Sequence, residues 1–442
     1  MDGQALTSPR DTRRVGRRRD YPGWRMVWAL SATTTVSYGV LLYAVSVLLT
    51  PMRHDLHASL GALSGAVSLS IAVAGLIAPF VGAWLDRHGA RALMTAGSLV
   101  AAASVVGWSQ ARSLPELYLA FAGIGVASAA LFYDSGFAVI NTWFDRDRHS
   151  ALLTLTVVAG FASTVFLPTT QALVDGFGWR DALLVLAALC AATALPHVLL
   201  LRRHPADHGY SLDGSDADAL PSSPATHQGG QWLQLRDPDV RSSLAAPTVR
   251  WLTVSTVAVT AGVTMIIVYL VTYLRTRGYS PAAAAIGAGA IGVMSVSGRV
   301  VFTRLVRRLR LARVAAAMLV GQMVGIAMLA WLPKPWGLIV FVLSFGSAFG
   351  VMTIARPALL GHYVAPRVFA RVSGVQAMLT DVGRIAAPVT AGALIAWTGG
   401  FGAMRVAVTV CSVIAAVALL RADAHDRVPP TSPRPSTARA VT

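Results

Sequence analysis

Twelve apolar runs, each long enough to cross a lipid bilayer, constrain the fold of this chain more than any other feature. A transmembrane helix needs about 20 mostly apolar residues. Because unpaired backbone N–H and C=O groups are costly in lipid, runs of this length form helices. The runs are 26–49, 59–84, 92–110, 116–141, 151–172, 180–201, 249–274, 281–303, 312–332, 336–361, 372–397 and 402–420. The sequence predicts an all-α integral membrane protein with twelve transmembrane helices.

Composition excludes several other classes of protein. The chain is 55% hydrophobic and 13% charged, whereas a soluble domain carries about a quarter charged residues. Its net charge is +17, but we find no soluble segment that would present a basic face, so we expect no nucleic-acid partner. Cys190 and Cys411 both fall in apolar runs, which argues against a disulfide framework. Histidine pairs with metal-like spacing lie in loops without a third ligand, so we expect neither a metal nor a cofactor.

The placement of arginine predicts the orientation in the membrane. With the N-terminus inside, 27 of the 37 Lys and Arg residues fall in cytoplasmic segments and six on the opposite face. Cytoplasmic loops carry such an excess. We therefore expect a multi-pass protein of the cell (plasma or inner) membrane with both termini cytoplasmic.

One long polar connection divides the chain into two halves. It is rich in Asp, Ser, Gly and Pro, too polar to pack and too long for an ordinary loop. The predicted organisation is a cytoplasmic tail at 1–25, a six-helix bundle at 26–201, a disordered cytoplasmic linker at 202–247, a second six-helix bundle at 248–421 and a disordered tail at 422–442.

A short charged turn interrupts the second and third apolar runs. It contains Gly82, Asp86, Arg87, Gly89 and Arg91. The glycines permit a tight bend, and the arginines suit a cytoplasmic surface. This spacing resembles the loop between helices 2 and 3 of the major facilitator superfamily.

The two halves repeat each other at matching offsets. Pro168 follows Asp86 by 82 positions, and Pro388 follows Arg307 by 81. The resemblance implies two pseudosymmetric six-helix bundles around one central path. The second-half loop has no equivalent of Asp86, so the ion pairing implied by the family is expected in the first half.

Further short motifs are similar to the monocarboxylate and oxalate/formate exchanger branch of that superfamily. They are Asn141-Thr-Trp143-Phe144 with Arg146 and Arg148, Gly178-Trp179-Arg180, the run from Arg203-His-Pro205 to Asp213-Gly214, and Tyr273 to Ser280.

Ionisable residues within apolar runs are candidates for function, because each costs about 2.5–3.5 kcal/mol to insert. Arg384 lies near the midplane and continues a polar stripe with Gln376 and Thr380 at helical spacing. A fixed guanidinium there can bind a carboxylate in bidentate fashion. The alternative is an intrahelical pair with Asp381, and both arrangements can hold in one molecule.

Arg299 lies below a stripe of small residues in helix 8. The resemblance implies that a helix 8 arginine faces the substrate together with a basic residue of helix 11, here Arg384. Ion pairing near the gate is the alternative role for Arg299.

Asp134 and Arg356 occupy equivalent places in helices 4 and 10. We expect them to form a pair between the halves that closes the cytoplasmic side; the alternative is that Arg356 only reaches toward the interface. Asp134 or Asp381 is also a candidate proton carrier, since burial favours the protonated form of an acid.

Tyrosine hydroxyls are candidate donors to the cavity. They are Tyr38 and Tyr43 in helix 1, Tyr133 in helix 4, and Tyr269 and Tyr273 in helix 7. Anchoring at the lipid interface or packing is the alternative role for each.

Three arginines and two aspartates within the runs leave a net charge of about +1, which favours an anionic solute. We therefore expect a non-enzymatic, monomeric transporter that moves a small organic anion, a mono- or dicarboxylate, by proton symport or anion exchange. An exporter of amphipathic drugs or metabolites, and a non-transporting membrane receptor or scaffold, are the alternatives. The expected partners are the bilayer, the anion and protons.

Overall fold

The computed structural model describes residues 21–208, 210, 212–214, 238–306 and 309–426, and the described elements are helices. The first half holds α1 (Pro22–Tyr38), the π-helix η2 (Gly39–Tyr43), α2 (Ala44–Asp55), α3 (Leu60–His88), α4 (Ala90–Gln110), α5 (Leu114–Leu131), α6 (Tyr133–Trp143), α7 (Arg148–Ala159), α8 (Ala162–Ala192) and α9 (Ala194–Leu200). The second half holds α11 (Pro238–Ala245), α12 (Pro247–Thr276), α13 (Pro281–Leu305), α14 (Leu311–Trp331), α15 (Trp336–Tyr363), α16 (Pro366–Thr398) and α17 (Gly402–Asp426).

The described helices account for twelve crossings of a membrane. Eleven segments are long and apolar enough to span, and one of them, Arg148–Leu200, contains 53 residues. At 1.5 Å per residue that segment would be about 80 Å long, far more than one crossing requires. It turns back at Gly178, whose φ of 80° and ψ of 165° a residue with a Cβ rarely adopts. The predicted all-α fold with twelve transmembrane helices is confirmed.

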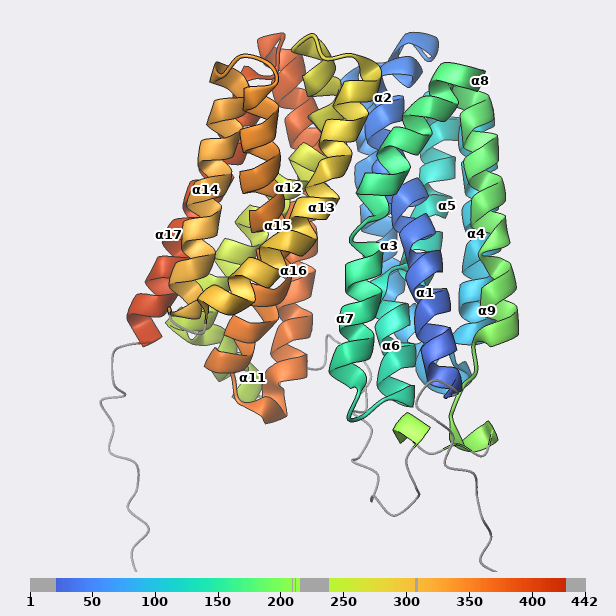
Figure 1. Cartoon of the computed structure of the whole chain (residues 1–442), viewed down its shortest axis with the longest axis vertical. Coiled ribbons are helices and arrows are strands. Elements are labelled where there is room, and N and C mark those ends of the chain that lie inside the picture. Colours follow the sequence, from blue (N-terminus) through green and yellow to red (C-terminus); the bar gives the residue numbers. More distant parts are fainter. Residues whose placement is uncertain (1–20, 209, 211, 215–237, 307–308, 427–442) are drawn as a thin grey trace, which may run out of the picture.

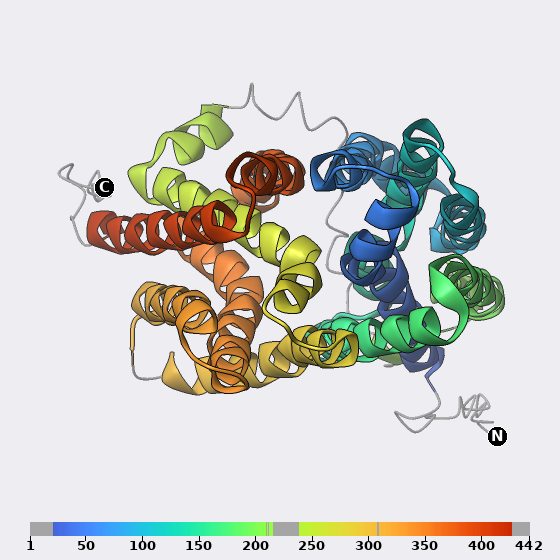
Figure 2. The same ribbon diagram turned by 90° about the horizontal axis from the view of Figure 1, so that it is seen from above.

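The two halves form separate bundles that stand side by side (Figure 1). In the view from above they face each other across the middle of the molecule (Figure 2). The start of α1 and the ends of α9 and α17 lie toward the lower edge in Figure 1. We call this edge the terminal face and the opposite edge the distal face.

The last helix is longer than the apolar run predicts. α17 continues to Asp426, so its end enters the segment 422–442, which we expected to be disordered. The added turn is held by Asp423, which is 5% exposed and pairs with Arg310 and Arg313. An ion pair to a neighbouring helix thus extends α17 beyond its apolar stretch.

The ends of the predicted linker are folded onto the bundles. Asp213 accepts hydrogen bonds from the backbone N–H groups of Asp145, Arg146 and Asp147 at 2.7–3.3 Å. It therefore caps the start of α7 with a carboxylate, which the helix dipole favours. The other end of the linker forms α11. The predicted disorder of 215–237, and of the tail segments 1–20 and 427–442, falls outside the described residues.

The most extensive contacts between the described parts of the two bundles join α3 with α16, α8 with α13, and α2 with α12. In α3 the distal residues Leu60, Leu63 and Ser64 are nearly inaccessible, whereas Leu76 and Phe80 toward the terminal face are 72% and 75% exposed. Gly61 and Gly392 lie so close at the distal end that a Cβ on Gly392 would meet the Gly61 Cα at 2.8 Å. The described contact between α3 and α16 is therefore tight at the distal face.

Candidate functional site between the two bundles

Helix 1 carries a π-helical turn at the level of the candidate site. η2 runs over Gly39–Tyr43, with Tyr38 immediately before it and Tyr43 at its end. π-Helical turns inside α-helices frequently occur at functional sites. The turn positions both tyrosines where the second bundle approaches.

Helix 4 is broken next to these tyrosines. Phe132 has an extended backbone (φ −77°, ψ −175°) that ends α5 and starts α6. The Tyr38 ring stacks on Phe132 with centroids 4.1 Å apart and lies 4.8 Å from the Tyr133 ring. Tyr133 stacks in turn on Phe137. The break thus presents a set of aromatic rings, followed at once by Asp134 in the first turn of α6.

Arg384 forms the expected intrahelical pair and also remains accessible. Its Nη1 lies 3.1 Å from Asp381 Oδ1, and the two side chains are 46% and 35% exposed. The charge of Arg384 acts on the Tyr38 hydroxyl of the other bundle, as does that of Asp134. Arg384 is therefore paired with Asp381 on its own helix and lies within electrostatic range of the first bundle.

Arg299 is the most enclosed of the candidate cations. It is 9% exposed, and its Nη1 donates to the Thr156 carbonyl of α7 at 3.2 Å. Its Nε is buried without a hydrogen-bond partner among the described residues. The charge acts on Tyr43 and Tyr133 across the interface. Among the described residues, one donor of this buried guanidinium thus has no partner where α13 meets α7.

Arg356 belongs to a hydrogen-bond chain inside the second bundle. Its Nε donates to Gln376 Oε1 at 3.2 Å, and Gln376 Nε2 donates to Thr253 Oγ1 at 3.3 Å. Thr380 donates to the Gln376 carbonyl. Gln376 and Thr380 are 0% and 2% exposed. The polar stripe below Arg384 therefore orients Arg356 in this conformation.

Asp134 stands apart from Arg356. It is exposed, and the described residues include no ion pair between the two, although Asp134 lies within electrostatic range of Arg356. The arrangement gathers five charged residues from both bundles around one region: Asp134, Arg299, Arg356, Asp381 and Arg384.

Comparison with known proteins decides the family. Residues 27–388 match the family model of the Major Facilitator Superfamily. The chain belongs to the major facilitator superfamily.

Curated relatives of this superfamily member are monocarboxylate transporters. Monocarboxylate transporter 12 of Rattus norvegicus is 26% identical over 74% of this chain and 70% of its own length. Monocarboxylate transporter 13 of the same species is 26% identical over 83% and 81%. Monocarboxylate transporter 11 of Mus musculus reaches 30% over 38% and 37%. The resemblance to the monocarboxylate branch is confirmed.

Solved structures show the same fold at low identity. A bacterial homologue of the human lysosomal transporter Spinster superposes with a TM-score of 0.72 at 16% identity, over 92% of this chain and 98% of that one. The nucleoside transporter NupG gives 0.69 at 16% identity, over 91% and 99%. This member of the superfamily therefore has the fold of its transporters, as the two pseudosymmetric bundles predict.

In this superfamily member, Tyr269 and Tyr273 do not lie beside the exposed Arg384. Tyr269 is 0% exposed, and its hydroxyl contacts Ser64 Oγ at 2.6 Å and the Pro388 carbonyl at 3.3 Å. Tyr273 is 5% exposed and packs on Phe401. Both tyrosines thus lie in or near the distal contact between the bundles, and their role as substrate donors stays a prediction.

The charged turn of the superfamily motif lies at the terminal face. Gly89, with a φ of 77°, ends α3 and starts α4. Asp86, Arg87 and Arg91 are exposed, and Gly82 has open space around its Cα. The role of this turn in conformational change stays a prediction.

Two features of the site involve residues that the sequence motifs do not single out. Phe132 and Phe137 form the aromatic surface together with Tyr38 and Tyr133; the run Phe132-Tyr133-Asp134 was a visible signal for it. The sequence gives no signal for Thr156, because its contact with Arg299 is made by the backbone carbonyl, which every residue has. The described residues contain no group of three side chains suited to a metal ion.

Proposed function

We propose that this protein is a secondary active transporter that moves a small organic anion, a mono- or dicarboxylate, across the cell membrane by alternating access. Proton symport and anion exchange are both compatible with the proposed site. Family membership and the monocarboxylate relatives support the transport of a small molecule. The anion is our inference from the site.

The observation that carries the proposal is the accessible guanidinium of Arg384 at the middle of α16. A charge at this depth is costly unless it is paired or meets a ligand. Asp381 occupies part of the hydrogen-bonding capacity of Arg384, and about half of the Arg384 side chain remains exposed. A guanidinium has five N–H donors, so a carboxylate can bind on the accessible side.

Arg299 provides a second cation for the same solute in this proposal. Its unpartnered Nε and its position beside Tyr43 and Tyr133 support a role at the wall of the site. Two cations at different helices would bind the two ends of a dicarboxylate, or the carboxylate and an adjacent oxygen of a monocarboxylate. Movement of α13 and α16 with the second bundle would couple binding to alternating access.

We further propose that the terminal face is cytoplasmic, since 27 of the 37 Lys and Arg residues belong to segments on that side. The tight distal contact of α3 with α16 then corresponds to closure toward the outside. We expect the monomer to be the transporting unit.

The aromatic surface of Tyr38, Phe132, Tyr133 and Phe137 favours a second candidate, the export of amphipathic molecules. Stacked rings at 4.1 Å and 5.4 Å offer apolar contact to a flat solute. A transporter of this type would tolerate neutralisation of Arg384 and Arg299.

Uptake into proteoliposomes distinguishes the two. We expect Arg384→Gln to abolish uptake of radiolabelled carboxylates such as lactate, oxalate or succinate. The exposed Arg250, near the start of α12, gives the matched control Arg250→Gln, which we expect to transport as the wild type does. Unchanged carboxylate uptake by Arg384→Gln would refute the anion site, and no counterflow of any solute by the wild type would favour a receptor or scaffold.

A further inference from the structure

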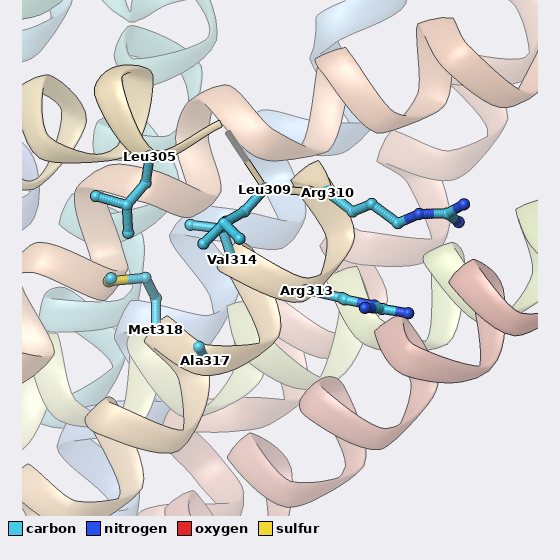
Figure 3. Close-up of a pocket in the computed structure, with 7 residues that line it drawn as sticks. All are labelled: Leu305, Leu309, Arg310, Arg313, Val314, Ala317 and Met318. Atoms are coloured by element: carbon cyan, nitrogen blue, oxygen red, sulfur yellow. The ribbon is translucent and has the colours of Figure 1, made fainter. Parts of the chain in front are cut away.

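A surface hollow lies where α13 ends and α14 begins (Figure 3), and it shares no lining residue with the site between the bundles. It has a volume of about 280 Å³. Its lining residues are Leu305, Leu309, Arg310, Arg313, Val314, Ala317 and Met318.

The hollow has an apolar part and a charged part. Leu305 and Met318 lie on one side, while the side chains of Arg310 and Arg313 extend together in the opposite direction (Figure 3). Leu309 is 57% exposed beside them. An apolar surface that ends in two guanidiniums is complementary to one phospholipid: the apolar part can contact an acyl chain, and the guanidiniums can bind the phosphate.

The charge of the two arginines is only partly compensated. Both contact one carboxylate, that of Asp423 in α17, through Arg310 Nη1 and Arg313 Nε at 3.3 Å each. The Asp423 side chain is 8% exposed, whereas those of Arg310 and Arg313 are 54% and 53% exposed. One carboxylate balances one guanidinium, so this group keeps a net charge of about +1. Most of the ten N–H donors of the pair remain for an outer ligand.

Asp423 also fixes the spacing of the two guanidiniums. A long arginine side chain loses rotamer entropy when it binds a ligand. The ion pairs with the nearly buried Asp423 already restrict both arginines, so part of this cost is met before a ligand binds. At the same ends of α13 and α17, Arg304 and Arg421 are exposed, and Asp426, one turn after Asp423, lies 3.2 Å from His362. A ligand with a phosphate therefore meets an ordered cationic surface.

We propose that this hollow binds one anionic phospholipid, with the phosphate on Arg310 and Arg313 and one acyl chain along Leu305, Leu309 and Met318. The position at the ends of two membrane-spanning helices places the arginines at headgroup depth, and Met318, further along α14 than Arg313, lies toward the hydrocarbon. The volume is too small for a whole lipid, so the hollow takes the glycerol-proximal part of one chain and the rest lies in the bilayer. The proposal does not depend on which solute is transported.

Native mass spectrometry of the purified full-length protein tests this proposal with phosphatidylglycerol and phosphatidylcholine as probes. We expect retention of phosphatidylglycerol over phosphatidylcholine, and a loss of affinity of about fivefold for each arginine removed in Arg310→Gln and Arg313→Gln. Arg241→Gln changes an exposed arginine of α11 outside the hollow and serves as the charge control.

A second variant keeps the ion pairs intact. Ala317 is an exposed part of the lining, so Ala317→Phe fills the hollow without a change of charge. We expect it to reduce phosphatidylglycerol retention while inorganic phosphate binding, measured by thermal shift, is unchanged. Equal retention of both lipids, or wild-type retention by both Arg310→Gln and Ala317→Phe, overturns the proposal. Full displacement of phosphatidylglycerol by millimolar inorganic phosphate assigns the site to a free anion and overturns it as well.

Discussion

The hydroxyl of Tyr269 in α12 lies 2.6 Å from Ser64 Oγ in α3, so one short hydrogen bond joins residues 205 positions apart across the two bundles. The same oxygen contacts the Pro388 carbonyl of α16 at 3.3 Å. Beside it, a Cβ on Gly392 would meet the Tyr269 hydroxyl at 2.6 Å and Ser64 Oγ at 2.7 Å. The Tyr269 hydroxyl and the absence of a side chain at Gly392 therefore both contribute to the distal contact.

Tyr269→Phe is expected to open the distal contact more often. Loss of a hydrogen bond worth about 0.5–1.5 kcal/mol shifts the equilibrium roughly twofold to tenfold. Maleimide labelling of Leu60→Cys, with Cys190 and Cys411 replaced by serine, measures the opening. Tyr118→Phe is the matched control, because the Tyr118 hydroxyl bonds to the Ala62 carbonyl within one bundle. Equal labelling rates in the two variants would contradict the assignment.

Asp381→Asn and Arg384→Gln are expected to have opposite effects on carboxylate binding. The first removes the partner that competes with the solute for the guanidinium, so affinity should hold or rise. The second removes a charge-assisted hydrogen bond of about 1.5–3 kcal/mol, a loss of roughly tenfold or more. Competition binding in detergent measures both. A similar loss in both variants would show that the pair acts only as a structural unit.

Exchange of the charges at Asp134 and Arg356 tests the predicted ion pair between the halves, which we expect in another conformation. Here Arg356 bonds to Gln376 instead. We expect each single change, Asp134→Arg or Arg356→Asp, to reduce uptake at least tenfold, and the double exchange to recover part of it, because an ion pair works in either direction. Recovery is measured in proteoliposomes; a double variant no better than the single ones would exclude the pair as a gate.

His197→Leu is expected to destabilise the first bundle. The ring is 0% exposed and links three helices: Nε2 lies 2.9 Å from Thr33 Oγ1, and Nδ1 lies 3.0 Å from Ser98 Oγ. Removal of these bonds costs about 1–3 kcal/mol. Thermal unfolding in detergent should show a lower Tm, whereas His204→Asn, at an exposed position, should not. An unchanged Tm in His197→Leu would mean that the neighbouring hydroxyls find other partners.

Asp213→Gly is expected to release the cap on α7. Glycine removes the carboxylate and accepts the positive φ of 57° at this position, so the effect of the cap is isolated from backbone strain. Loss of a capping group costs about 1 kcal/mol locally. Hydrogen exchange at Asp145, Arg146 and Asp147 should become faster. The exposed Asp207 provides the control Asp207→Gly, and equal exchange in both variants would contradict the prediction.

The sequence by itself determined the features that depend on nearest neighbours along the chain. The length of each apolar run determined the twelve crossings. Lipid offers no hydrogen-bond partners, so the backbone N–H and C=O groups of such a run must pair with each other in a helix. The pair of Arg384 with Asp381 follows from a spacing of three residues on one helix, which places both side chains on one face. Superfamily membership was visible in the turn at Asp86 and in the matching offsets of the two halves.

Only the tertiary structure decided what the helices bring to one another. The break at Phe132, the π-helical turn before Tyr43 and the engagement of Arg356 by Gln376 depend on packing partners far along the chain. The same holds for Tyr269, a candidate cavity donor by sequence whose hydroxyl the fold buries against Ser64. A periodicity states which residues share a face of a helix. The crossing angle and rotation of each helix decide which neighbour that face meets, and these are set by the packing of the whole bundle.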